Sequence, residues 1–325
     1  MILCETHELH KTQYPDQSLE EIQSIIKNRG SQFIRALQQY KPNLSFLSIW
    51  LSGLIAEEKK TKPVLNTRHL LLLSFIEGIL EAKNKQVTVI DGNETAYWYY
   101  KPSQFLESIA LLKKTSAGLM RSKKTKAAAL NILTGQTVYY DGIMARNPLF
   151  DQGFDNTQKW NWLTENINYA MASSNSVVWF YSERNNWWEN VNDTLLQVLQ
   201  ASKNAFAGPR AVNTKKGNSL KPVLFKSLAF NEGKGYFYMD DSKNPMKTGE
   251  VAFSYKWDGI HKTLSIQFGK NIPVTVMVFA NNIPSTINAN IQSTLKIKLS
   301  KFKKGKIIIL AKYAANLEAS AIHVY

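Results

Sequence analysis

Residues 176–188 place several chemically capable side chains directly after an apolar run. The run 177–181 is β-branched and aromatic, which is typical of a buried strand. A carboxyl group followed by hydrogen-bonding groups and flat rings can bind a sugar and cleave its glycosidic bond. Glu183 is therefore the leading catalytic candidate, and the substrate-binding candidates beside it are Arg184, Asn186 and Trp187.

These side chains also have structural interpretations. Trp187 and Trp188 can pack beneath the following helix, since indoles are well suited to cores. Glu183 can pair with Arg184 or cap a helix. The catalytic interpretation is favoured because a strand followed by a carboxylate recurs earlier in the chain.

Three further carboxylates lie at or near the ends of predicted strands. Glycosidic cleavage requires one protonated carboxyl group and a second, ionised one. Glu5 is the first candidate partner for Glu183, followed by Asp91 and Asp141. Asp91 and Asp141 can instead cap the loop or helix that follows them. Further substrate-binding candidates are Glu94, Trp98 and Tyr140.

The elements that position these residues alternate between strand and helix. Ser18 and Glu21 have the spacing of a capping box, and 51–66 is predicted to be a polar loop. Such alternation predicts parallel strands joined by helices, with the chemistry at the carboxyl ends of the strands. The predicted strands are 2–4, 44–50, 87–91, 137–143 and 177–181, and the predicted helices are 18–40, 69–82, 103–133, 156–173 and 193–206.

The last third of the chain has a different pattern. Gly, Pro, Lys, Asn and Ser dominate 207–222, which we interpret as a linker between a domain at 1–206 and one at 223–325. Short apolar runs separated by turn residues then predict an antiparallel β-sandwich. Asp258-Gly259 is typical of a hairpin turn.

The net charge of +15 is concentrated in this last part, because residues 207–325 contain 18 Lys or Arg against 6 Asp or Glu. Alternating lysines, as at 295–299, are first interpreted as a solvated sheet face or a protected edge. Binding of a polyanion is the second and less favoured interpretation. No apolar stretch reaches the roughly 18 residues of a transmembrane segment.

Several kinds of chemistry lack a sequence signal. Cys4 is the only cysteine, which excludes an internal disulfide. The glycine-rich motifs of nucleotide-binding proteins are missing, so we expect no nucleotide and no cofactor. His7 and His10 lie near Glu5 and Glu8, but Pro15 and the preceding strand suggest a loop there, so no metal site is expected.

Four segments carry a family resemblance: VIDGNETAYWY (89–99), YYD (139–141), WNWLTEN (160–166) and VWFYSERNNWW (178–188). They resemble the later half of a poorly characterised group of (β/α)8-barrel proteins that is similar to glycoside hydrolases. The resemblance covers about residues 1–205. It implies that the five strands are the last five of eight in a TIM-type barrel, and that an accessory β-sandwich domain follows the barrel in the sequence. It supplies no catalytic pair.

Two functions follow as expectations. The first is a glycoside hydrolase acting on an oligo- or polysaccharide, and the alternative is a carbohydrate-binding or surface-interaction protein without turnover. A strand beginning at Met1 suggests that upstream sequence is missing. If a signal peptide has been lost with it, the protein is periplasmic or extracellular. We then expect an open sheet whose strands at Ile2 and Val177 are unpaired edges.

Overall fold

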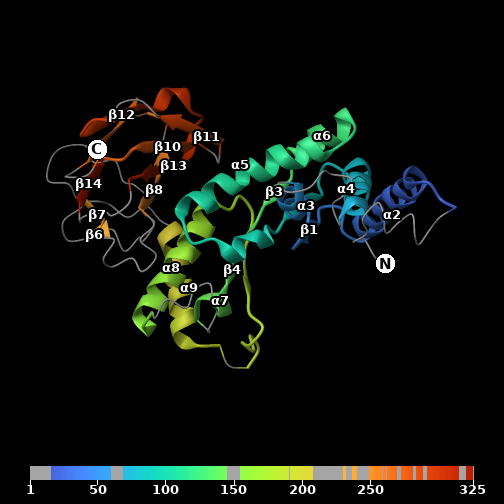
Figure 1. The fold of residues 1–325 in the computed structure, drawn as a ribbon, viewed down its shortest axis with the longest axis horizontal. Coiled ribbons are helices and arrows are strands. Elements are labelled where there is room, and N and C mark those ends of the chain that lie inside the picture. The colour runs from blue at the N-terminus through green and yellow to red at the C-terminus, as the bar shows by residue number, and fades with distance from the viewer. Residues whose placement is uncertain are drawn as a thin grey trace. The chain divides into compact units, whose positions relative to one another are not determined.

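The computed structural model divides into two compact units, each built from several stretches of the chain (Figure 1). The first comprises Met1–Thr95, Ser108–Thr137 and Ser174–Trp179, and the second comprises Ala96–Glu107, Val138–Ser173 and Phe180–Tyr325. The structure describes residues 16–59, 69–144, 154–189, 191–207, 230–231, 236–239, 249–257, 259–260, 262–268, 272–280, 283–287, 291–314 and 320–324. The predicted linker at 207–222 lies, apart from Ala207, outside these residues, and the predicted domain boundaries stay a prediction.

A parallel sheet forms the centre of the first unit. Its strands are β1 (Ser45–Ser48), β2 (Thr88–Asp91) and β3 (Leu133–Thr134), paired in that order. Val89 and neighbouring apolar residues are buried in the core of this unit, as the β-branched runs predict. Spatial order therefore equals chain order, which is the arrangement that consecutive βα units produce.

Helices cover this sheet. The predicted capping box of α2 is confirmed: Ser18 Oγ accepts from the backbone N–H of Glu21, whose carboxylate accepts from the Ser18 N–H. The prediction of a loop at 51–66 is wrong for its first half, because 52–59 is helical. The cap of this helix comes from Asp91, far along the chain, and so leaves no local signal. The helices are α2 (Leu19–Tyr40), α3 (Ser52–Lys59), α4 (Leu70–Ala82), α6 (Lys123–Ala129) and the later part of α5 (Pro102–Leu119).

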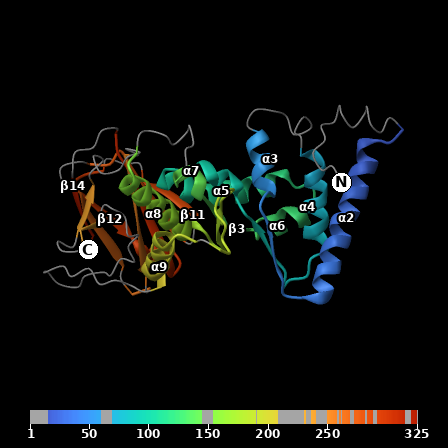
Figure 2. The ribbon, with the colours of Figure 1, turned by 90° about the horizontal axis from the view of Figure 1, so that it is seen from below.

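Helices α2 and α4 lie side by side in both ribbon views and touch through their backbones (Figure 2). A Cβ atom on Gly30 would overlap the carbonyl oxygen of Phe75, and one on Gly78 would overlap the carbonyl oxygen of Lys27. The Ser31 hydroxyl donates to the carbonyl of Gly78 at 3.0 Å. The two glycines therefore permit an approach that a side chain would prevent.

Two polar residues in the apolar sequence of α4, Ser74 and Glu77, bind Arg121. Glu77 is buried, and its carboxylate accepts from the backbone N–H of Arg121 at 2.6 Å and from its Nε at 2.8 Å. The guanidinium also donates to Ser74. A buried carboxylate needs such partners, because an unpaired charge there is costly.

None of the helices that the structure describes has the length and apolar character of a bilayer-spanning segment.

The second unit begins with the ends of two further strands, β4 (Gln136–Tyr139) and β5 (Val178–Tyr181), which pair with each other. The strand predicted at 137–143 ends early, at Tyr139, because the chain turns into the short helix α7 (Tyr140–Met144). Helices α8 (Asn156–Ser173) and α9 (Asp193–Ala207) pack on one another, as both views show.

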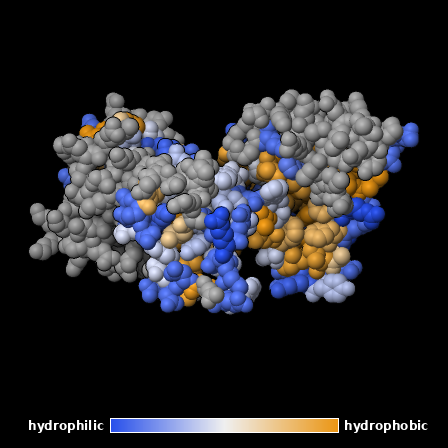
Figure 3. Space-filling view, turned by 60° about the horizontal axis from the view of Figure 1, so that its bottom comes forward, coloured by the Kyte–Doolittle hydropathy of each residue, from blue (hydrophilic) through white to orange (hydrophobic). Residues whose placement is uncertain are grey.

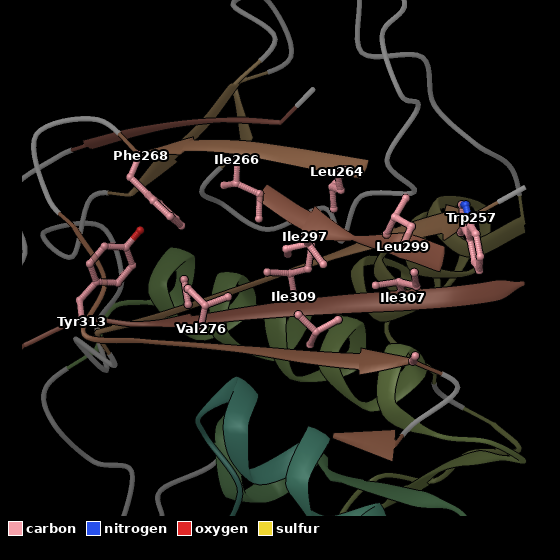
Figure 4. Close-up of a cluster of buried hydrophobic side chains, with 13 residues drawn as sticks. Trp257, Leu264, Ile266, Phe268, Val276, Ile297, Leu299, Ile307, Ile309 and Tyr313 are labelled. Carbon is pink, nitrogen blue, oxygen red and sulfur yellow. The ribbon is translucent and has the colours of Figure 1, made fainter. Parts of the chain in front are cut away.

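Two antiparallel sheets complete the second unit. Apolar side chains of both sheets point into one common core, including Leu264 and Ile266 from one sheet and Val276 and Ile309 from the other (Figure 4). One sheet has the order β11-β10-β13-β8 and the other β12-β9-β14-β7-β6. The strands are β6 (Phe230–Asn231), β7 (Tyr236–Met239), β8 (Glu250–Trp257), β9 (Thr263–Phe268), β10 (Thr275–Ala280), β11 (Ile283–Ile287), β12 (Thr294–Lys298), β13 (Gly305–Lys312) and β14 (Ser320–Val324).

The hairpin predicted at Asp258-Gly259 is wrong. β8 pairs with β13, whereas β9 pairs with β12 and β14, so the turn connects one sheet to the other. Trp257 and Leu264, on either side of the turn, both enter the common core. Gly259 has a φ of +89°, a backbone conformation that favours glycine.

The start of α5 is held against the antiparallel sheets by two carboxylates. Glu250 accepts from the backbone N–H of Ser103 at 3.0 Å and from its hydroxyl at 2.9 Å, at the helix N-terminus where an anion is favoured. Glu107 pairs with Lys312 at 2.6 Å. These contacts join helical and β segments within the second unit.

A partly buried lysine is expected to make the stability of this unit pH-dependent. The Lys306 Nζ donates to the carbonyl of Ala172 at the end of α8, and burial lowers the pKa of Lys306 from 10.5 to about 8. Between these two pH values the unfolded chain holds a proton that the folded chain has released. Because the unfolded state then binds more protons, stability rises with pH from about 8 to 10.5.

We expect Lys306→Met to remove this rise. The difference between the unfolding free energies of the variant and the parent protein should change by up to about 3 kcal/mol across this range, at about 1.4 kcal/mol per pKa unit. Urea unfolding at several pH values between 7 and 10.5 measures the difference. Parallel stability curves for the two proteins would contradict the prediction.

Hydrophobic side chains are exposed on the surface of the first unit (Figure 3). They include Phe33 and Leu37 of α2 and Leu47 of β1, with Ile49 and Trp50 just beyond it. Among the described residues β1 is an end strand of its sheet. The strand predicted at 2–4, and with it the edge predicted at Ile2, lies outside the described residues. The other predicted edge, the strand expected from Val177, corresponds to β5, which pairs with β4 and is likewise an end strand among the described residues.

The chain is thus a mixed α/β protein. Helices and parallel strands form its N-terminal part, and antiparallel strands form its C-terminal part. This is the coarse fold class that the sequence predicts.

Candidate functional site

Asp141 and the loop after β5 form the framework of the candidate site. Asp141 is buried in the first turn of α7, with 7% of its surface exposed. Its carboxylate accepts from the Ser182 hydroxyl at 3.0 Å and from the backbone N–H groups of Glu183 and Arg184. Two predicted catalytic residues, Asp141 and Glu183, are therefore brought together. Asp141 fixes the backbone on which Glu183 stands.

Glu183 itself is exposed. The Tyr181 hydroxyl donates to its Oε1 at 3.2 Å. Tyr181, the last residue of β5, thus contacts a carboxylate that is open to solvent. Such a group can reach a bound ligand, which the buried Asp141 cannot do while its oxygens hold the loop.

Three tyrosine rings lie behind this carboxylate. Tyr97 and Tyr181 are stacked, with ring centroids 5.1 Å apart and planes 14° from parallel. Tyr139 lies 5.1 Å from Tyr97 and 5.5 Å from Tyr181. Burial raises the pKa of Tyr139, and the nearby charges of Glu183 and Asp141 raise it further. Its phenol therefore stays protonated at neutral pH and can donate a hydrogen bond.

Two of the nearby tryptophans contact tyrosines of the site, and a third, Trp188, lies in the loop after β5. Trp188 has 94% of its surface exposed and Trp98 has 46%, while Trp187 is partly buried against Tyr140 with ring centroids 6.2 Å apart. Trp98 contacts Tyr139 edge to face. The following helix does not cover Trp188, so the alternative of packing beneath it does not apply to that ring.

Hydrogen bonds of the Asn186 side chain and of the Asn185 backbone shape the loop. Asn186 accepts from the backbone N–H of Trp188 at 3.1 Å and donates to Glu189 at 2.9 Å. Asn185 donates through its backbone N–H to the Ser182 hydroxyl at 2.9 Å. Arg184 is exposed. The loop is thus internally bonded and presents Arg184 and Trp188 outward.

Asp91 has a different environment, in the first unit. Its carboxylate accepts from the Ser52 hydroxyl and from the backbone N–H groups of Gly53 and Asn93, each at 3.0 Å. Burial raises the pKa of Asp91, and these donors oppose the rise. Asp91 therefore caps the N-terminus of α3, which precedes it in the chain, and its bond to the Asn93 N–H also holds the loop that follows it, as the structural alternative expects.

The remaining predicted residues are placed as follows. Glu94 is partly buried in the first turn of the short 3-10 helix η2 (Glu94–Trp98). Glu5, together with His7, Glu8 and His10, lies outside the described residues. Within the described ranges, no three His, Cys, Asp or Glu side chains are grouped as metal ligands would be.

Sequence reasoning did not assign Tyr97, Tyr139 and Tyr181 to the site. Tyr139 and Tyr181 end apolar strands, so each resembles an ordinary core residue, and Tyr97 lies in η2. The available signal is positional, since Tyr139 ends β4, Tyr181 ends β5 and Tyr97 lies in the segment after β2. Comparison of the chain with protein-family models and with curated proteins gives no match.

Proposed function

We propose that the chain is a carbohydrate-active protein of the glycoside hydrolase kind, and that the loop after β5 forms part of its sugar-binding site. The observation that supports this proposal most is that one loop carries both an exposed indole, Trp188, and an exposed carboxylate, Glu183. Exposed indoles offer flat apolar faces to sugar rings. In the proposed site Glu183 supplies one of the two carboxyl groups of glycosidic cleavage, and Glu5 is the first candidate for the other.

The fold is compatible with a partial TIM-type barrel. Strands β1, β2 and β3 pair in chain order, and β4 and β5 pair next in sequence. In barrels of this type the loops at the carboxyl ends of the strands carry the chemistry, and Glu183 follows β5 directly. We assign the antiparallel sheets to an accessory sandwich that follows the barrel segment in the sequence.

A second candidate function is carbohydrate binding without turnover. The specific observation in its favour is Asp141, whose two oxygens are occupied by the loop donors of Ser182, Glu183 and Arg184. A carboxylate in that role cannot also serve as nucleophile or base. Hydrolysis then requires another carboxyl group, and Glu5 is the proposed one.

The binding part of the proposal is tested with Trp188→Ala. We expect the affinity for neutral oligosaccharides to fall at least about fivefold, because the loss of an aromatic contact surface is worth roughly 1 kcal/mol or more. Isothermal titration calorimetry against a panel of soluble oligosaccharides measures the change.

Tyr40 offers a matched control, since its ring is 91% exposed at the end of α2 in the first unit. Tyr40→Ala should leave the affinity unchanged. Equal affinities of the parent protein and Trp188→Ala for every sugar bound, or no binding to any of them, would rule out the proposed site.

A further inference from the structure

We propose that one end of the five-stranded sheet binds an acidic polysaccharide through a group of lysines, which we call the lysine face. The lysine face lies at β12 and the turn that follows it (Figure 1). All of its members are exposed: Lys262, Lys296, Lys298, Lys301, Lys303 and Lys304. This inference concerns a surface other than the aromatic loop and goes beyond the proposed function.

The strand register sets the direction of the first lysines. In β12, Ile297 enters the core opposite Leu264, so Lys296 and Lys298 point to the outer face. Two residues in a strand span about 7 Å, so the two amines form one row. The backbone N–H of Leu299 donates to the carbonyl of Lys262 at 2.9 Å, which brings Lys262 to the same end of the sheet.

The turn after β12 adds the remaining lysines. Leu299 is fully buried and Phe302 packs partly against the core, so these two anchor the turn. Exposed Ser300 and Lys301 lie between them, exposed Lys303 and Lys304 follow, and the stem of Lys304 lies beside Gly259. Three apolar anchors in the segment 296–304 are therefore interspersed with five exposed lysines.

The sequence between Asp258 and Glu318 is strongly basic. Residues 259–317 contain nine lysines and no Asp, Glu or Arg. Two of the nine have other roles, since Lys306 is partly buried and donates to the carbonyl of Ala172, and Lys312 pairs with Glu107. A row of like charges costs repulsion, and an anionic partner relieves it.

The chemistry of the neighbours favours a polysaccharide over a nucleic acid. Thr263 and Thr294 are exposed beside the lysines on the paired strands β9 and β12, and hydroxyl groups suit the hydroxyl-rich surface of a glycan. Binding of single-stranded nucleic acid relies on aromatic platforms and arginine. Among the described side chains of this face there is no arginine and no exposed aromatic ring.

The experiment compares Lys296→Glu/Lys298→Glu with a control of equal charge change, Lys123→Glu/Lys126→Glu, whose lysines are exposed on α6. The probes are heparin for sulfate groups, polygalacturonate for carboxylates, dextran as a neutral chain, and DNA. We expect the parent protein to bind at least one acidic polysaccharide and not dextran. Raising NaCl from 50 to 200 mM should weaken that binding at least about tenfold.

The lysine-face variant should lose at least tenfold in affinity for the acidic polysaccharide and keep its thermal midpoint, while the α6 variant should lose less than threefold. Equal losses in the two variants would show a net-charge effect and overturn the proposal. DNA binding as tight as polysaccharide binding would identify a different partner and also overturn it. Neutral-oligosaccharide binding tests the aromatic site separately, so the failure of one proposal is distinguishable from failure of the other.

Discussion

Glu183→Gln is expected to lower the hydrolysis of a responsive polysaccharide at least about 100-fold, since a positioned acid or base contributes 10²–10⁴-fold. The amide keeps the size of the carboxyl group and removes its charge and its exchangeable proton. The Tyr181 hydroxyl can still donate to the amide oxygen, as it does to Oε1 in the parent protein at 3.2 Å. The loop backbone is bound by Asp141 and should not move.

Release of reducing ends from a panel of polysaccharides measures turnover, and a thermal unfolding curve checks the fold. Glu20→Gln removes an exposed carboxylate in the first turn of α2 and serves as the control for loss of charge. If Glu183→Gln retains full turnover, Glu183 is not catalytic. If the parent protein binds sugars and never releases products, binding without turnover is the correct function.

Elements that depend on local sequence are predicted accurately, and elements that depend on contacts far along the chain are not. β2 and β5 are predicted to within a residue, because each is a local apolar run. Helix α3 is missed because its cap is Asp91, more than 30 residues later. Strand β11 contains Pro284 and polar residues, and it forms by pairing with β10 rather than by its own propensity.

The site was predictable in its location and less so in its roles. Because the carboxyl ends of neighbouring strands converge, Asp141 was expected near the Glu183 loop, and its carboxylate does accept from the Glu183 N–H. It cannot say which carboxylate holds the backbone and which remains exposed, because that depends on individual hydrogen bonds. The lysines of β12 show the same limit, since alternation predicts that they point outward and cannot identify what they bind.

Gly78→Ala is expected to destabilise the first unit by about 2 kcal/mol or more, although alanine favours a helix by up to about 1 kcal/mol over glycine. The added methyl group would overlap the carbonyl oxygen of Lys27 on α2, which is backbone and has no rotamer to change. The helices must then separate, which weakens the Ser31 hydrogen bond to Gly78 and loosens the apolar packing around Ile34 and Ile76.

Gly118 supplies the matched control, because it is also helical and a Cβ atom there would meet nothing within 4 Å. Gly118→Ala should therefore leave stability unchanged or raise it by up to about 1 kcal/mol. Urea unfolding followed by circular dichroism measures both variants against the parent protein. Opposite signs for the two substitutions would show that close backbone approach, rather than helix propensity, decides the effect at Gly78. Equal stabilisation by both would mean that α2 and α4 do not cross through these glycines.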